Sequence, residues 1–413
     1  MKFYDTCSLL DLQQDAFKEN FFISSITLVE LEEIKTSGLK DEEIKWSARQ
    51  LLYLLDANEE MVTVIPYNTI IHDAIIKTYG LMPNNDSRII VTAFQCYKGN
   101  STITFVTSDA ACREVAKSIG LPVESTFANP EEDYLGYEEI IMDNTKLALF
   151  YSEILPQNLN FCRLLENEYL LIKDTENNII DKYKWKEDKY IQIPFCKAES
   201  RMFGKVTPKN QDPYQQIALD SLATNQVTLL RGPAGSGKSY LAFARMFELL
   251  ESGKIDKIII FCNTVATKGS AKLGFYPGSR TEKLLDSQIG NLLESKLGDK
   301  MAVEKLIDEG QLILLPLSDI RGYDTTGMNA AIYISEAQNL DIELMRLALQ
   351  RIGEDSICII DGDYTHQVDM AMYAGARNGM RRVSKVFKGQ PFFGEVTLKN
   401  IHRSKIAEIA EQL

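Results

Sequence analysis

Residues that often mark a metal site or a disulfide scaffold are scarce in this 413-residue sequence. Only three histidines occur, at positions 72, 366 and 402, which excludes a histidine-rich metal centre. The cysteines form no Cys-x-x-Cys pair, which argues against a zinc finger and fits a reducing compartment. No apolar run approaches the roughly 20 residues of a membrane span, and no secretory leader opens the chain. We therefore expect a cytoplasmic protein without a membrane partner.

Positive charge is also in short supply. Lys and Arg total 45 against 58 Asp and Glu, a net charge of −13. Such a chain binds nucleic acid poorly as a whole, so any contact must come from a local basic patch or a bound metal. One patch near the C-terminus fits a nucleic-acid contact, but fits a solvated helix face at least as well. It consists of Arg377, Arg381, Arg382, Lys385 and Lys388.

The apolar pattern divides the chain into three parts: 1–125, 126–205 and 206–413. In the first, short strands alternate with helical stretches, which predicts a parallel α/β sheet. The second part begins with a helical pattern, EEIIMDNTKLALFYSEIL, and continues with a hairpin pattern around Glu-Asn-Asn, so we expect a linker with a small β-rich module. The third predicts a doubly wound α/β domain. Its five apolar runs are VTLL, KIIIF, QLILLPL, AAIYI and SICIID.

The most specific motif is a glycine-rich loop between a predicted strand and an amphipathic helix, the context that a phosphate-binding loop requires. Its backbone N–H groups and the helix N-terminus are suited to surround the β- and γ-phosphates of ATP. We predict that Lys238 reaches the phosphate oxygens and that the Ser239 hydroxyl joins the coordination of Mg²⁺. The predicted ATP-binding residues are Gly232, Pro233, Ala234, Gly235, Ser236, Gly237, Lys238 and Ser239.

Two later strands end in residues suited to ATP hydrolysis. Glu336 follows the run AAIYI and is predicted to polarise the attacking water. The usual partner of such a glutamate is a preceding aspartate in the magnesium shell, but this chain has the uncharged Ser335, which points to slow hydrolysis. Asp361 and Asp363 end the segment SICIIDGD and begin a polar cluster that favours sensing of the γ-phosphate over simple helix capping. The cluster continues with Thr365, His366 and Gln367.

With these motifs in order, residues 206–413 resemble the PhoH family of ATPases, relatives of the superfamily 1 helicase core. The resemblance implies that Gln215 contacts adenine, that Arg321 lies near the nucleotide, and that Arg403 acts as an arginine finger. Such a finger is often supplied by a neighbouring subunit, which implies a homo-oligomer such as a hexameric ring. The chain departs from the family at Ser335, and Asp361 is the candidate to compensate. The matching segments are PKNQDPYQQIALDSL, GPAGSGKS, KLGFYPGSRTEKL, IRGYDTTGMNAAIYISEAQN, GDYTHQVD and NIHRSKIAEIAEQL.

Residues 1–125 resemble a PIN domain, the nuclease fold at the N-terminus of PIN–PhoH fusion proteins. PIN chemistry gathers carboxylates at the carboxyl ends of parallel strands, where they share Mg²⁺ or Mn²⁺. The resemblance implies metal ligation by Asp5, Glu30, Asp86 and Asp109, with Asp5 and Asp109 also catalytic. The alternative is that the acids are separate helix caps, because an individual Asp at a strand end is more often a cap than a ligand. Polar neighbours support the metal site: Asn85, Thr107 and Ser108.

Two functions from different classes follow. The first is an ATP-driven RNA helicase or translocase that grips single-stranded RNA and is coupled to a metal-dependent ribonuclease. The second is a nucleotide-gated scaffold with little ATP turnover and no nuclease activity. Glu336, Arg403 and the four PIN acids favour the enzyme, whereas Ser335 and the acidic surface favour the scaffold. The sequence does not distinguish RNA from DNA.

Overall fold

The computed structural model describes most of the chain in two compact units. The first contains residues 1–133 and Arg377, and the second contains the other described residues from 134 onward. The described residues are 1–38, 42–125, 133–262, 293–295, 297–298, 300–365 and 377–402. His366, Gln367 and Arg403, which the sequence singled out, lie outside them. Among the helices in these ranges, none is long and apolar enough to cross a membrane.

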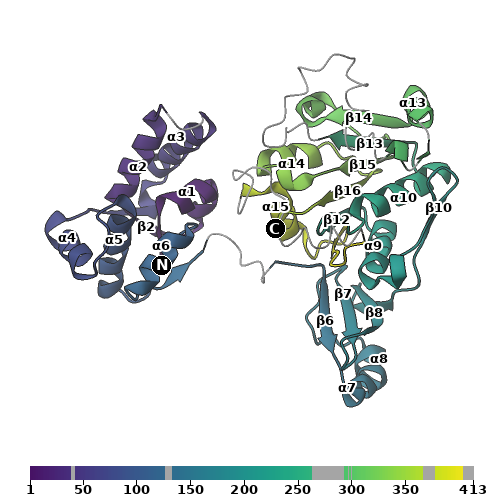
Figure 1. Ribbon diagram of the computed structural model, residues 1–413, viewed down its shortest axis with the longest axis horizontal. Coiled ribbons are helices and arrows are strands. Elements are labelled where there is room, and N and C mark those ends of the chain that lie inside the picture. Colours follow the sequence, from purple (N-terminus) through teal and green to yellow (C-terminus); the bar gives the residue numbers. More distant parts are fainter. Residues whose placement is uncertain are drawn as a thin grey trace. The chain divides into compact units, whose positions relative to one another are not determined.

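The first unit is a five-stranded, wholly parallel sheet with the strand order β3-β2-β1-β4-β5. Helices follow the strands along the chain, so the parallel α/β fold predicted for this part is confirmed (Figure 1). The strands are β1 (Lys2–Tyr4), β2 (Phe21–Ser24), β3 (Val62–Ile65), β4 (Thr104–Val106) and β5 (Val123–Glu124). The helices are α1 (Thr6–Leu12), α2 (Ser25–Thr36), α3 (Glu42–Ala57), α4 (Thr69–Thr78), α5 (Asn85–Gly99) and α6 (Ala110–Ser118).

Strand alternation gives the first unit two cores. Phe3 and Phe105 join a cluster formed with α5 and α6, whereas Tyr4 and Val106 join a second cluster formed with α1, α2 and α3. Successive side chains of a strand point to opposite faces, so two helical layers cover the sheet. Asp5 comes directly after β1, at the carboxyl edge of the sheet.

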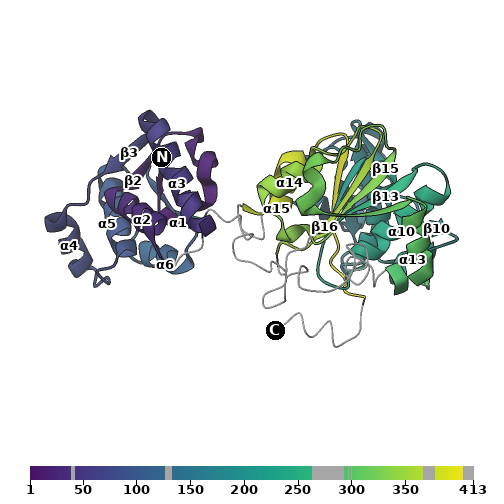
Figure 2. The ribbon, with the colours of Figure 1, turned by 90° about the horizontal axis from the view of Figure 1, so that it is seen from above.

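The second unit contains a six-stranded parallel sheet with the order β14-β13-β15-β16-β12-β17. Figures 1 and 2 show α10 on one face and α14 and α15 on the other. The strands are β12 (Val227–Arg231), β13 (Lys257–Cys262), β14 (Leu312–Pro316), β15 (Ala330–Ile334), β16 (Ile357–Gly362) and β17 (Phe393–Thr397). The helices are α9 (Pro213–Thr224), α10 (Lys238–Glu251), α13 (Lys300–Asp308), α14 (Ile342–Leu349) and α15 (Gly379–Phe387).

The five strands predicted for this sheet are confirmed, and the sixth, β17, was missed. Its sequence includes Gly394 and Glu395, two residues that are uncommon in strands. Glu395 is nevertheless 1% exposed, and β17 pairs with β12 along its whole length. Pairing next to the strand that leads into the phosphate loop overrides the weak local preference.

The β-rich segment lies in the second unit (Figure 1). It forms a four-stranded sheet of order β6-β7-β8-β9 and a separate antiparallel pair, β10 and β11. The predicted hairpin is confirmed: β7 and β8 are antiparallel, and the Asp174 carboxylate accepts two N–H groups in the turn. The helix predicted from residue 138 is wrong at its start, because this stretch pairs with β7 as a strand. The elements are β6 (Tyr137–Ile141), α7 (Asn144–Leu149), α8 (Leu155–Gln157), β7 (Tyr169–Lys173), β8 (Ile179–Lys186), β9 (Lys189–Gln192), β10 (Ala198–Ser200) and β11 (Gly204–Val206).

This small sheet shares a core with the six-stranded sheet. Tyr169 and Leu171 are buried in one cluster with side chains of α9 and α10. At Gly136 the backbone of this segment lies against the backbone of β17. The φ of Gly136 is +83°, and an added Cβ would lie 1.8 Å from the carbonyl oxygen of Glu395. Only glycine fits there, so the segment packs against β17 by its backbone.

Candidate nucleotide site and acidic edge

The loop between β12 and α10 adopts a conformation that depends on glycine. Gly232, Gly235 and Gly237 have φ values of 146°, 85° and 97°, a region that other residues rarely adopt. At Gly232 an added Cβ would also lie 2.4 Å from the carbonyl oxygen of Leu398. The spacing of glycines in the sequence therefore reflects a backbone requirement.

Lys238 and Ser239 begin α10 and place their polar groups beside the loop. The Lys238 ammonium donates to the carbonyl oxygens of Gly232, at 2.5 Å, and Pro233, at 3.0 Å. The Ser239 hydroxyl donates to the Asp361 carboxylate at 2.7 Å. A helix N-terminus attracts anions, so a cation and a hydroxyl here suit a bound phosphate.

Asp361 lies at the centre of the polar contacts at this edge of the sheet. It is 2% exposed, on β16, between the loop strand β12 and β15. The oxygen that accepts from Ser239 also accepts from the Tyr333 hydroxyl at 2.6 Å, and the other oxygen accepts from the Glu336 N–H at 3.2 Å. Burial, and then the charge of Asp361, raise the pKa of Tyr333 well above its usual value of 10, so the phenol stays a donor. Sequence reasoning missed Tyr333, the single polar side chain in an otherwise apolar strand.

Glu336 follows β15 with an exposed side chain and a strained backbone. Its φ of 50° and ψ of 41° are left-handed, a conformation that costs a non-glycine residue about 1 kcal/mol or more. Its carboxylate accepts from the Gln338 amide at 2.6 Å, and that amide oxygen accepts from the Asp363 N–H at 3.2 Å. Gln338 was also missed, although it follows Glu336 by only two residues. Backbone strain at an exposed acid is a common feature of functional positions.

Asp363, predicted to sense the γ-phosphate, is 2% exposed. Its carboxylate accepts from the Thr365 N–H at 2.9 Å, which forms a turn after β16. Ser335 is likewise buried, one residue beyond the pair Ile334–Ile360 that links β15 to β16.

Gln215 and Arg321 stay predictions for the nucleotide site. The Gln215 amide oxygen accepts from the Lys209 N–H at 2.8 Å, in the segment before α9, and the amide nitrogen donates to the Ser236 carbonyl oxygen at 2.9 Å, which joins α9 to the phosphate loop. Arg321 is exposed in the turn that follows β14. Four strand spacings of roughly 4.8 Å separate β14 from β12.

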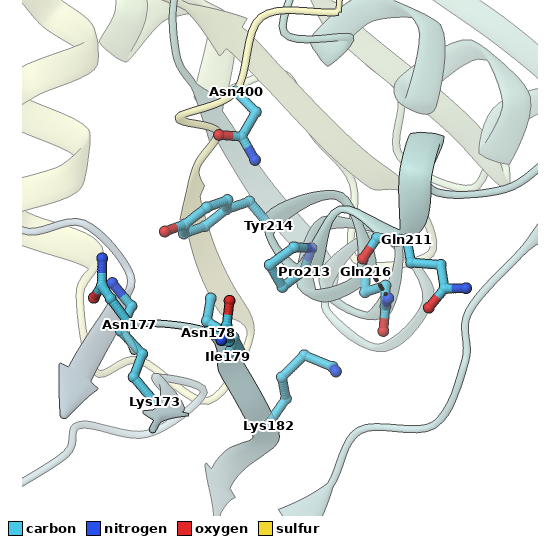
Figure 3. A pocket seen from close by; sticks show the side chains of 10 residues that line it. All are labelled: Lys173, Asn177, Asn178, Ile179, Lys182, Gln211, Pro213, Tyr214, Gln216 and Asn400. Atoms are coloured by element: carbon cyan, nitrogen blue, oxygen red, sulfur yellow. Dashed lines mark hydrogen bonds between the residues drawn. The ribbon is translucent and has the colours of Figure 1, made fainter. Parts of the chain in front are cut away.

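An open cavity of about 470 Å³ lies beside the N-terminus of α9 (Figure 3). Asp212 caps this helix, and its carboxylate also accepts from the His402 ring at 2.5 Å and from the Asn400 amide at 3.2 Å. The backbone N–H of His402 donates to the carbonyl oxygen of Gly235 in the loop. Asn400 of the cavity lining is thus linked by hydrogen bonds to the phosphate loop, although Gln215 is not among the lining residues. Those residues are Lys173, Asn177, Asn178, Ile179, Lys182, Gln211, Pro213, Tyr214, Gln216 and Asn400.

In the first unit, Asp5 is held between two elements. One carboxylate oxygen accepts from the Ser8 N–H at 2.7 Å and caps α1, and the other accepts from the Thr107 hydroxyl at 2.5 Å. Asp5 is 5% exposed. Burial raises the pKa of Asp5 to about 6, and the hydrogen bonds from Ser8 and Thr107 oppose part of that rise.

The other three acids interact by charge. Burial is the main cause that raises the pKa of Glu30 and of Asp86, with further contributions from Asp86 to Glu30 and from Asp109 to Asp86. Glu30 accepts from the Thr6 hydroxyl, and Asp109 caps α6 by accepting from the Cys112 N–H at 2.9 Å. Like charges within such reach repel unless a cation offsets them.

Both interpretations of the acids have support. Asp5 and Asp109 cap helices, and within the described ranges no three His, Cys, Asp or Glu side chains converge to hold a metal ion. The electrostatic coupling nevertheless relates Glu30 to Asp86 and Asp86 to Asp109. The predicted ligand set therefore stays a prediction.

Comparison with known proteins assigns a family to most of each unit, and we call the second unit the PhoH-like unit. Residues 205–413 match the family described as PhoH-like protein, and residues 4–126 match the family described as PIN domain. This chain belongs to the PhoH-like family and carries an N-terminal PIN domain.

The similarity extends over nearly the whole of one relative. Protein PhoH2 of Bacillus subtilis is 27% identical over an alignment of 432 positions, which covers 96% of this chain and 95% of that protein. Protein PhoH2 of Thermobispora bispora is 27% identical over 338 residues, 80% of this chain and 74% of that protein. A PhoH-like protein of Mycobacterium tuberculosis is 34% identical over 184 residues, 44% of this chain and 49% of that protein. The family and the order of its domains, as predicted, are confirmed.

The PhoH-like and PIN domains imply the use of a nucleotide and a divalent metal in general. In the PhoH-like unit the donors fit, because the Ser239 hydroxyl and the Asp361 carboxylate lie together at the N-terminus of α10. Mg²⁺ is usually bound by such protein oxygens together with the phosphate oxygens of the substrate. In the PIN domain the carboxylates have the right chemistry, although the four side chains do not form a closed ligand set.

Proposed function

We propose that this chain hydrolyses ATP to move along or unwind single-stranded RNA, and that its PIN domain cleaves RNA with Mg²⁺ or Mn²⁺. One observation carries the ATPase proposal. Glu336 is exposed and strained, and its N–H donates to the buried Asp361, which accepts the hydroxyl of Ser239 in the phosphate loop. A site that only bound nucleotide would not need an exposed carboxylate on a strained residue whose backbone N–H is linked to the loop through Asp361.

In the proposed mechanism the loop glycines surround the phosphates, and Lys238 turns from the loop carbonyls to the phosphate oxygens. Glu336 orients the attacking water, and its hydrogen bond to Gln338 limits the side-chain freedom. Bound Mg²⁺ supplies positive charge that offsets the phosphates. The remaining roles are Gln215 at the adenine, Arg321 near the nucleotide, Asp363 at the γ-phosphate, and Arg403 as a finger from a neighbouring subunit of a ring.

The helix α15 supports a contact with RNA. It presents the exposed Lys385 near its C-terminal end, and Arg381 lies 4.8 Å from the ring of Tyr364. In an acidic chain a local basic surface is what a phosphate backbone requires. Tyr364, the ring that Arg381 contacts, directly follows Asp363 in the sequence. Through Tyr364, RNA bound at α15 would influence the nucleotide site, and the bound nucleotide would influence RNA binding.

In the PIN domain, Asp5, Glu30, Asp86 and Asp109 are the proposed metal ligands, with Asp5 and Asp109 nearest the reaction. A divalent metal bound there would supply an activated water. Burial favours the protonated form of Asp5, so the residue releases its proton most readily when a cation is near. Convergence of the four side chains on the cation is part of the proposal.

The second candidate is a nucleotide-gated scaffold, and the uncharged Ser335 favours it. ATP turnover of one preparation, measured with and without single-stranded RNA, distinguishes the two. We expect turnover that RNA stimulates, that falls at least tenfold in Glu336→Gln, and that persists in Glu343→Gln, an exposed acid on α14. ATP binding without turnover in either condition would establish the scaffold instead. Metal-dependent RNA cleavage, lost in Asp5→Asn and kept in Lys238→Ala, tests the PIN domain in the same preparation.

A further inference from the structure

We infer that Asp361 is the carboxylate of the magnesium shell at the phosphate loop, a role that the sequence pattern of the family assigns to position 335. The inference deepens the proposed ATP site and rests on it. It makes Asp361 a metal-positioning residue of this chain and removes the main argument for a site without turnover.

The strand order supports this assignment. Asp361 lies on β16 and is paired with Leu230 of β12, the strand that leads directly into the loop. Ser335 follows β15, which is one strand farther from β12. A carboxylate on the nearer strand reaches the first turn of α10, as the 2.7 Å contact between Ser239 and Asp361 shows.

The surrounding donors fix the carboxylate in place. The Tyr333 hydroxyl, at 2.6 Å, and the Ser239 hydroxyl share one oxygen, and the Glu336 N–H contacts the other. Tyr333 in turn packs edge-on against Phe243 of α10, with ring centroids 5.0 Å apart. The Asp361 side chain is thereby oriented before any ligand binds, which lowers the entropic cost of coordination.

The chemistry of the ion agrees with a single buried carboxylate. Mg²⁺ is held in phosphate-binding sites through one or two carboxylates together with substrate phosphates, and keeps several waters. The P-loop hydroxyl and one aspartate are the protein groups that such sites provide. Here the hydroxyl already donates to Asp361, whereas Ser335 has no charge to contribute.

A test follows from the magnesium dependence of nucleotide binding by the full chain. The probe is a fluorescent ATP analogue, titrated in EDTA and at increasing Mg²⁺ concentrations. We expect Mg²⁺ to strengthen binding to the parent, and Asp361→Asn to need at least tenfold more Mg²⁺ for the same effect while binding in EDTA is unchanged. Asp355→Asn, an equal loss of charge at an exposed position before β16, should match the parent. An unchanged Mg²⁺ requirement in Asp361→Asn would overturn the inference.

A second variant decides the matter where Asp361→Asn does not fold. Asp361→Glu keeps the charge and the acceptor oxygens that Tyr333 and Ser239 contact, but moves the carboxylate by one methylene. Because Mg²⁺ demands near-ideal ligand geometry, we expect a higher Mg²⁺ requirement with unchanged binding in EDTA. An unchanged Mg²⁺ requirement would refute the assignment of Asp361.

The ATPase proposal and the assignment of Asp361 can be refuted separately. Lack of nucleotide binding by the parent would remove both. Mg²⁺-dependent binding without turnover, lost in Asp361→Asn, would contradict the ATPase proposal and support the assignment of Asp361. Turnover by the parent with an unaltered Asp361→Asn variant would contradict the assignment alone.

Discussion

Replacement of Asp5 by Asn should stabilise the PIN domain at neutral pH. Asp5 is 5% exposed, and burial raises its pKa from 3.8 to about 6. Asn keeps the size of the side chain and the oxygen that caps α1, because Asn is as good a helix cap as Asp. The Thr107 hydroxyl, which donates to Asp5, can accept from the Asn amide instead. The substitution therefore removes a buried charge with little change in packing.

The sign and size of the effect follow from the difference in pKa. Between about pH 4 and pH 6 the folded state binds more protons than the unfolded state, so stability falls as the pH rises through this window. Above pH 6 the whole cost of ionising Asp5 is present. A rise of about two pKa units corresponds to roughly 3 kcal/mol. Asp5→Asn should thus raise the free energy of unfolding by up to about 3 kcal/mol at pH 7.5 without metal, and change it little near pH 4.

The assay must follow one unit of the chain at a time, because two units do not unfold as one transition. Trp46 lies on α3 of the PIN domain and Trp185 on β8 of the PhoH-like unit, so a Trp185→Phe background leaves Trp46 as the reporter. Urea unfolding in EDTA at both pH values then gives the difference. Glu32→Gln, which removes an exposed charge paired with Lys35 at 3.0 Å, is the control and should show no pH-dependent gain.

Two results would refute the reasoning. Equal stability of Asp5→Asn and the parent at pH 7.5 would mean that ionised Asp5 carries no cost in the fold. A gain of the same size at both pH values would point to packing or capping, because only a titrating charge produces a gain that appears across the window.

Two further predictions concern the PhoH-like unit. Gly136→Ala should lower the free energy of unfolding of this unit by about 2 kcal/mol or more, because the new Cβ meets the Glu395 carbonyl. The control Gly204→Ala has a φ of +82° and nothing within 4 Å, so it should cost only about 1 kcal/mol of backbone strain. Equal losses in urea unfolding followed by Trp185 would contradict the packing of the small sheet. Mixing Arg403→Ala subunits with Lys238→Ala subunits, each inactive alone, should restore part of the ATPase activity if the finger acts between subunits. No recovery in mixed assemblies would show that Arg403 acts within its own chain.

The sequence was sufficient to predict features that are formed by residues close together along the chain. The phosphate loop could be predicted because Gly232, Gly237, Lys238 and Ser239 lie within eight residues, between a strand and a helix. The buried parallel strands were evident as apolar runs, and the turn at residues 176–178 marked the hairpin. Local preference failed for β17, where Gly394 and Glu395 conceal a strand, and for β6, where acidic residues imitate a helix.

The contacts at the two sites depended on tertiary structure. Ser239 and Asp361 are 122 residues apart, and they meet because β16 lies between β12 and β15, an order that no periodicity in the sequence encodes. The same holds for Tyr333, whose hydroxyl donates to Asp361 only because the two strands are neighbours. In the PIN domain the sequence identified the acids, and the fold decided that Asp5 is buried against Thr107. Residue type and spacing thus determined which chemistry is available, and strand order determined which groups come within hydrogen-bonding distance.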